Sequence, residues 1–178
     1  DYVAKWGHLA NDYEIYNHKA NKINGEYSNN VLSVSAEYGR KKDIGSNWYI
    51  EPQAQLQYAR VTAADYVTTQ GTEVSLDAIN SLIARAGFRI GKDINARSTI
   101  YFKGDILHEF LGEQEIHAKD GTGIMDKTFA NKGTWYDLGF GFATALGRSC
   151  YAYADIEKSF GNDNDKTYQI NVGMNWSF

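Results

Sequence analysis

The chain has few of the residues that break or cross-link a fold. Proline occurs once among 178 residues, at Pro52, and cysteine once, at Cys150. A single cysteine excludes an internal disulfide, so Cys150 is interpreted as a small residue near a turn. No run of about 18 apolar residues occurs, which excludes a transmembrane helix. Membrane-spanning β-strands are not excluded, because apolar and polar residues alternate in them and no long apolar run arises.

A strong excess of one charge is also missing. The chain carries 18 Lys and Arg against 22 Asp and Glu, and this mild acidity predicts no nucleic-acid partner. No signal peptide starts at Asp1, so a mature product or a piece of a longer protein is expected. No linker is recognisable, and residues 1–178 are expected to form one domain. The 13 Tyr, 17 Gly and 4 Trp favour strands with aromatic belts.

The last segment of the chain alternates strictly between apolar and polar residues. One series is large and apolar: Tyr168, Ile170, Val172, Met174, Trp176 and Phe178. The residues between them are small or polar. Side chains alternate faces along a strand, so the segment predicts one apolar and one wet face. An outer-membrane barrel strand has this pattern, with lipid on one side and a polar lumen on the other. The last strand of a soluble sandwich or barrel is the alternative.

The same alternation predicts strands over residues 2–9, 31–40, 48–58, 80–90, 98–111, 134–147 and 151–160. With the last segment this makes about eight, so the expected fold is all-β, a transmembrane antiparallel up-and-down β-barrel. Leu138, Phe140 and Phe142 are expected to face lipid with the apolar residues of the last segment. Charged residues on the opposite faces are expected to line the lumen: Glu51, Arg85, Arg89, Lys103, Asp105, Glu109, Asp137, Asp155 and Glu157. Lys158 and His108 are exceptions near strand ends.

The connections between these strands alternate in length. Residues 40–47, 92–97 and 147–149 are short connections on the side where the chain ends, whereas 12–30, 61–79 and 113–133 are long loops on the other side. Residues 161–165 form the one short connection there. Short periplasmic turns and long extracellular loops are the rule in these barrels, which predicts a periplasmic carboxy terminus. At Pro52, which lacks a ladder donor, a local bulge or bend is expected.

Four stretches resemble the translocator domain of autotransporters, the type V secreted proteins of Gram-negative bacteria. They are residues 48–56 (WYIEPQAQL), 86–89 (AGFR), 133–139 (GTWYDLG) and 159–161 (SFG). The chain end also resembles the assembly signal of outer-membrane proteins, with Asn171, Gly173, Trp176 and Phe178 in the specified places. The resemblance implies a barrel in outer-membrane lipid, inserted by the barrel-assembly machinery, that anchors the protein and exports its own amino-terminal passenger.

The resemblance also implies a twelve-stranded barrel with a helix through its pore, whereas this chain supplies about eight strands. A closed barrel of eight strands is filled by its own side chains, so the chain is interpreted as the carboxy-terminal part of a translocator. Three possibilities stay open for its closure: the chain closes on itself, pairs with strands of another protein, or is completed by a further segment.

No catalytic residue pattern is recognised, and no enzyme activity, cofactor or metal is expected. His8, His18, His108 and His117 lack metal-ligand spacing, and residues 162–165 (NDND) are interpreted as a hairpin turn. Gly139 and Gly141 are expected to make room for an inward aromatic such as Trp135 or Tyr151. Alternative functions are a small stand-alone barrel that acts as an adhesin or structural protein through its long loops, an outer-membrane enzyme, and a soluble carrier with inverted faces.

Overall fold

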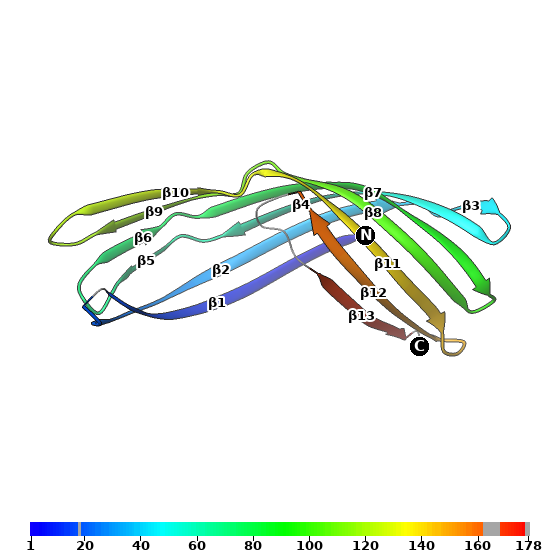
Figure 1. Ribbon diagram of the computed structural model, residues 1–178, viewed down its shortest axis with the longest axis horizontal. Coiled ribbons are helices and arrows are strands. Elements are labelled where there is room, and N and C mark those ends of the chain that lie inside the picture. Colours follow the sequence, from blue (N-terminus) through cyan, green and yellow to red (C-terminus); the bar gives the residue numbers. More distant parts are fainter. Residues whose placement is uncertain (18, 162–167, 177–178) are drawn as a thin grey trace.

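The computed structural model describes residues 1–17, 19–161 and 168–176, which form one large antiparallel sheet (Figure 1). Its strands are β1 (Tyr2–Tyr16), β2 (Lys22–Gly39), β3 (Lys42–Gly45), β4 (Trp48–Val61), β5 (Ala64–Val67), β6 (Glu73–Leu76), β7 (Ile79–Asn95), β8 (Ser98–Glu109), β9 (Glu113–Lys119), β10 (Ile124–Ala130), β11 (Gly133–Ala145), β12 (Cys150–Phe160) and β13 (Gln169–Trp176). Within the described ranges, no helix is long and apolar enough to cross a membrane.

Eight strands form the main path of the sheet, in the order β1-β2-β4-β7-β8-β11-β12-β13. Every neighbouring pair on this path is antiparallel. The predicted all-β, up-and-down arrangement of eight strands is therefore confirmed. The sheet is an open half-barrel, because β1 and β13 do not pair with each other in the described part of the chain.

The two faces of the sheet differ in curvature. On one face, side chains reach each other across an intervening strand: Lys103 of β8 contacts Asp155 of β12 over β11. Arg85 of β7 likewise contacts Glu37 of β2 over β4. Side chains from strands that are two apart come this close only on the concave side of a curved sheet. This face is therefore the inner one. The other face is convex.

The three segments predicted as long loops are mostly strands, which corrects that expectation. Residues 12–30 continue β1 and β2 as a single hairpin, in which the last pair is Tyr16 with Lys22. Residues 61–79 contain the hairpin β5–β6, and residues 113–133 contain the hairpin β9–β10, which pairs with β6. Together they form an arm beyond the main sheet, on the left of Figure 1. Alternation continues through these segments, so the ladder of hydrogen bonds continues as well.

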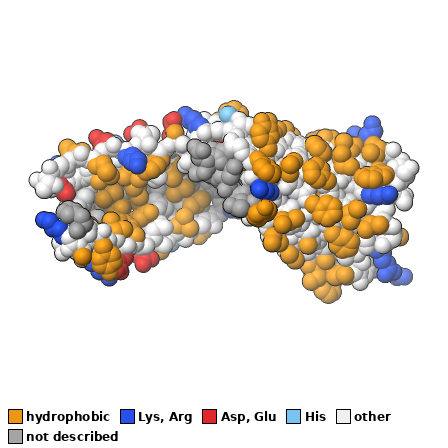
Figure 2. All heavy atoms as spheres, in the orientation of Figure 1, with side chains coloured by type: hydrophobic (Ala, Val, Ile, Leu, Met, Phe, Trp, Pro, Cys, Tyr) orange, Lys and Arg blue, Asp and Glu red, His pale blue; other side chains and the backbone are white. Residues whose placement is uncertain are grey.

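The polarity of the two faces reverses in this arm. A small apolar cluster of Ala64, Val74 and Leu76 packs there, with Tyr27, Tyr66, Ile116 and Ala118 against it. Tyr27 stacks on Tyr66 with a centroid distance of 5.0 Å, and the hydroxyls of Tyr13 and Tyr66 lie 3.1 Å apart. Apolar side chains of the arm thus gather on its inner face, as in a water-soluble sheet. Figure 2 shows hydrophobic side chains in the hollow of this half of the molecule.

Pro52 lies in an unbroken stretch of β4, so a bulge in β4 at that residue is the wrong expectation. The register from Glu51 to Gln53 against β7 has no shift. The interruption lies instead in the neighbouring strand, between the end of β2 at Gly39 and the start of β3 at Lys42. The carbonyl of Pro52 accepts a hydrogen bond from the Arg40 amide at 3.3 Å. In an antiparallel sheet, the N–H and C=O groups of one residue point to the same neighbouring strand. The carbonyl of Pro52 points to the interruption between β2 and β3, so the missing N–H of Pro52 would point there too.

Candidate functional site

The convex face carries the residues predicted to contact lipid. Leu138, Phe140 and Phe142 of β11 are 45%, 54% and 40% exposed. The apolar residues of the last segment are at least as exposed: Tyr168, Ile170, Val172, Met174 and Trp176. Figure 2 shows the hydrophobic side chains that cover the right half of the molecule. Contact of this face with lipid stays a prediction, and Phe178 lies outside the described residues.

Lys158 and His108, the two exceptions named from the sequence, have local partners on this face. The ammonium of Lys158 lies over the rings of Phe160 and Tyr168, at 5.1 and 5.2 Å from their centroids. The Nδ1 atom of His108 lies 2.7 Å from the hydroxyl of Thr134, and its ring packs edge-on against Phe110. Both side chains therefore combine an apolar contact with a polar tip, as expected near a membrane interface.

The concave face carries a network of ion pairs. Arg85 lies at its centre, 3.0 Å from Glu37 and 3.0 Å from Asp105, and its Nε donates to Gln55 at 3.0 Å. Asp105 is only 8% exposed. Arg89 makes a looser pair with Glu51 at 3.7 Å. The sequence pattern predicted Arg85, Arg89, Asp105 and Glu51 for this face. Which of them are partners follows only from the order of the strands in the sheet.

A second network joins β8, β12 and β13. The Lys103 ammonium lies 2.9 Å from Asp155 and 2.8 Å from Glu157. Asp155 also accepts hydrogen bonds from the Asn171 amide at 2.9 Å and from the Tyr101 hydroxyl at 3.2 Å. Asn171, predicted as part of the assembly signal, therefore fixes the last strand to this charged cluster.

Glu109 and Asp137 are the most buried carboxylates of the concave face, each 6% exposed. Glu109 accepts hydrogen bonds from the amides of Leu82 and Leu111, at 2.8 and 3.0 Å, and from the Ser81 hydroxyl. It therefore satisfies backbone donors where β8 ends, a role that the sequence did not reveal. Asp137 lies directly across from Asp105 in the ladder of β8 and β11.

Arg85→Gln is expected to destabilise the barrel more than Arg89→Gln. The first change leaves Glu37 and Asp105 without their cation, whereas the Arg89 pair is longer and both of its side chains are more exposed. We expect a loss of about 1–2 kcal/mol for Arg85→Gln, below the range for dry interiors because the face is hydrated. For Arg89→Gln we expect less than about 1 kcal/mol. Urea unfolding in detergent or vesicles measures both, and equal losses would contradict the network.

Glycines of the concave face lie under inward side chains, as predicted, but not under the residues named. A Cβ at Gly141 would overlap the ring of Tyr101, and one at Gly139 would overlap the Lys103 side chain. The expectation of Trp135 or Tyr151 over these glycines was wrong, because the partner is the residue directly opposite in β8. The same arrangement recurs in the last strand, where Gly173 lies under Tyr153.

Gly141→Ala is expected to destabilise the sheet by about 1–3 kcal/mol, since the added methyl displaces the Tyr101 ring from its place over the strand. In a Tyr101→Ala background the same substitution should cost little, because no ring remains to be displaced. A double-mutant cycle by denaturant unfolding measures this coupling. Additive losses from the two substitutions would contradict the packing described here.

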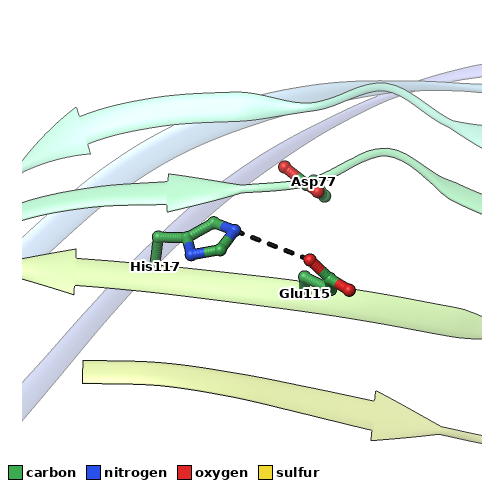
Figure 3. A group of neighbouring side chains, drawn as sticks. All are labelled: Asp77, Glu115 and His117. Atoms are coloured by element: carbon green, nitrogen blue, oxygen red, sulfur yellow. Dashed lines mark ion pairs between the residues drawn. The ribbon is translucent and has the colours of Figure 1, made fainter.

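Figure 3 shows one group of potential metal ligands in the arm. Glu115 and His117 alternate along β9 with Ile116 and Ala118 of the inner apolar cluster, so they lie on the outer face. The ligand atoms of Asp77, Glu115 and His117 lie within 4.8 Å of one another, and all three residues are exposed. The Nδ1 atom of His117 lies 2.7 Å from Asp126, and this hydrogen bond, more than any other effect, raises the pKa of His117. Because these side chains are solvated, we interpret the group as surface ion pairs. The signal in the sequence was the spacing of Glu115 and His117, which share a face of β9.

The chain is similar to known proteins both in sequence and in structure. The family model described as autotransporter beta-domain matches residues 1–157. The pertactin autotransporter of Bordetella parapertussis is 30% identical over 182 residues, covering 100% of this chain and 19% of the relative. The probable autotransporter YcgV of Escherichia coli is 27% identical over 184 residues, again covering 100% of this chain and 19% of the relative. The chain thus spans about a fifth of the length of these curated relatives.

A solved structure supports the fold. The crystal structure of the beta domain of the Bordetella autotransporter BrkA matches with a TM-score of 0.74 and 22% identity. The match covers 99% of this chain and 65% of the BrkA chain. The half-barrel is therefore similar to a large part of a known barrel.

Proposed function

Because the chain belongs to the autotransporter beta-domain family, we propose that it forms part of a translocator barrel that anchors its protein in the bacterial outer membrane and exports the attached passenger. The observation that carries this proposal is the separation of the two faces. The convex face is an exposed apolar band, and the concave face carries the ion-pair network around Arg85 and Lys103. An exposed apolar face is stable against lipid, and a charged face is stable against the water of a hydrated pore.

The proposal requires the barrel to be closed by further strands. An open edge cannot persist in hydrocarbon, because its unpaired N–H and C=O groups have no water to bond. The main path of the described sheet ends in two such edges, at β1 and β13. A closed barrel of eight strands would be filled by side chains, whereas additional strands between these edges leave room for a polypeptide. The greater length of the BrkA beta domain supports this reading.

We place the short turns and the end of β13 in the periplasm and the arm outside the cell. Trp176 pairs with Cys150, so β13 ends beside the turn between β11 and β12. The barrel-assembly machinery is the proposed partner for insertion, through the exposed terminal stripe, and outer-membrane lipid is the solvent of the convex face. In this orientation a passenger leaves the hydrated lumen and meets the apolar inner face of the arm. The proposal includes no catalytic step.

Site-directed labelling of the full-length protein in intact cells tests the orientation. Cys150→Ser removes the thiol of this chain, and Thr122→Cys at the tip of β9–β10 or Gly147→Cys in the turn after β11 introduces a new one. A membrane-impermeant maleimide should label position 122 only, and protease added outside should reach the passenger. Labelling of position 147 alone would reverse the orientation, and a passenger retained inside would overturn export. The small adhesin is less well supported, because the matched relatives are about five times longer than this chain.

A further inference from the structure

A cationic groove lies at the interruption between β2 and β3, on the side of the short turns. It has a volume of about 500 Å³ and is lined by Arg40, Lys41, Lys42, Ile50 and Pro52. Lys42 lies directly across from Ile50 in the ladder of β3 and β4, and the Arg40 amide bonds the carbonyl of Pro52. The groove therefore opens on the convex face, at the end of the apolar band.

Two of the three cations in the groove are available to a ligand. The Lys41 ammonium lies 3.9 Å from Asp93 and 3.9 Å from the centroid of the Tyr49 ring, so it already has partners. Within residues 1–17, 19–161 and 168–176, neither the Arg40 guanidinium nor the Lys42 ammonium has an ion-pair partner. Two positive charges without a counterion thus border the apolar side chains of Ile50 and Pro52.

A third cation and an aromatic residue extend this surface. Lys92 pairs with Trp48 across β4 and β7, and its ammonium lies 5.2 Å from the centroid of the indole. Trp48 is 40% exposed on the same face as Ile50. Tryptophan and lysine together are typical of the membrane–water interface. In the proposed orientation, the groove therefore lies where headgroups meet acyl chains.

We propose that this groove binds an anionic glycerophospholipid of the inner leaflet, with its phosphate at Arg40 and Lys42 and an acyl chain along Ile50. The proposal rests on the translocator function and its orientation. Charge complementarity favours this ligand, since a phosphate supplies the counterion that both side chains lack. A zwitterionic lipid supplies less net charge, and basic pockets at the membrane surface select anionic headgroups. The groove is open because the strand opposite Pro52 is interrupted between β2 and β3.

Native mass spectrometry of the full-length protein in mild detergent tests this inference. Phosphatidylglycerol, cardiolipin, phosphatidylethanolamine and lipid A are added separately, and the lipid-bound fraction is measured. The test variant is Arg40→Gln with Lys42→Gln. The control is Arg97→Gln with Arg148→Gln, which removes the same charge from two exposed residues of the other short turns. Each cation near an anionic surface contributes about fivefold, so the test variant should retain phosphatidylglycerol or cardiolipin about five to thirty times less, and the control should match the unmodified protein.

Three results would overturn the proposal: equal lipid loss in both variants, no preference for phosphatidylglycerol or cardiolipin over phosphatidylethanolamine, or preferential retention of lipid A. A gel shift on heating shows that each variant is folded. Passenger display on cells separates this inference from the proposed function, because the groove variant should lose lipid while its passenger still reaches the surface. A passenger missing from the surface in the unmodified protein would instead contradict the translocator.

Discussion

Leu138→Arg is expected to lower the stability of the barrel in lipid by about 2–4 kcal/mol. The side chain lies on the convex face in the middle of β11, with Phe140 next on the same face. An arginine there must leave water for hydrocarbon, or distort the bilayer to keep its charge hydrated. Phe140→Arg should have a similar effect. Urea unfolding of the full-length protein in phospholipid vesicles measures the difference.

Asp137→Arg is the matched control, one residue away in the same strand. Asp137 lies on the concave face, opposite Asp105 and beside the cluster around Lys103. An arginine at this position enters a face already rich in carboxylates, so the loss in lipid should be clearly smaller than for Leu138→Arg. Equal losses for the two positions, or a greater loss for Asp137→Arg, would mean that the faces are assigned the wrong way round.

Trp176→Asn is expected to lower the yield of folded, membrane-inserted barrel by more than tenfold. Trp176 is 62% exposed at the end of β13 and continues the stripe of Met174, Val172 and Ile170. Removing an aromatic side chain that lipid would cover costs about 1.5–3 kcal/mol, and about 1.4 kcal/mol is tenfold. Phe178→Asn should act in the same direction. The folded fraction is measured by the heat-dependent gel shift of the protein from outer-membrane fractions.

Asn175→Ser provides the control for this effect. Asn175 is in the same strand, on the face opposite Trp176, and pairs with Tyr151. Its replacement changes polarity little and leaves the apolar stripe intact, so assembly should be nearly normal. An unchanged yield for Trp176→Asn would show that the terminal apolar stripe is not part of the assembly signal. A loss for Asn175→Ser as large as for Trp176→Asn would show that the strand, and not its apolar face, is what the cell recognises.

Several features of the fold could be predicted because they depend on local patterns. Period-two alternation in residues 134–147 separated Leu138 and Phe140 from Asp137, and the structure places them on opposite faces. Residues 12–30, 61–79 and 113–133 were predicted as loops because they were the long connections between the recognised strands. In the arm the apolar face turns inward, so residues such as Tyr27 and Val74 belong to a small core. The pattern of a lipid-facing strand does not apply there, and the strands were missed.

The sequence by itself determined the strands of the main sheet and the face of each side chain, since alternation is a property of each strand alone. Tertiary structure decided which strands are neighbours and in what register. That order gives Arg85 two carboxylates, Lys103 two more, and Gly141 a tyrosine above it. It also places the break between β2 and β3 opposite Pro52. These contacts join residues far apart in the chain, and a local pattern holds no information on such pairs.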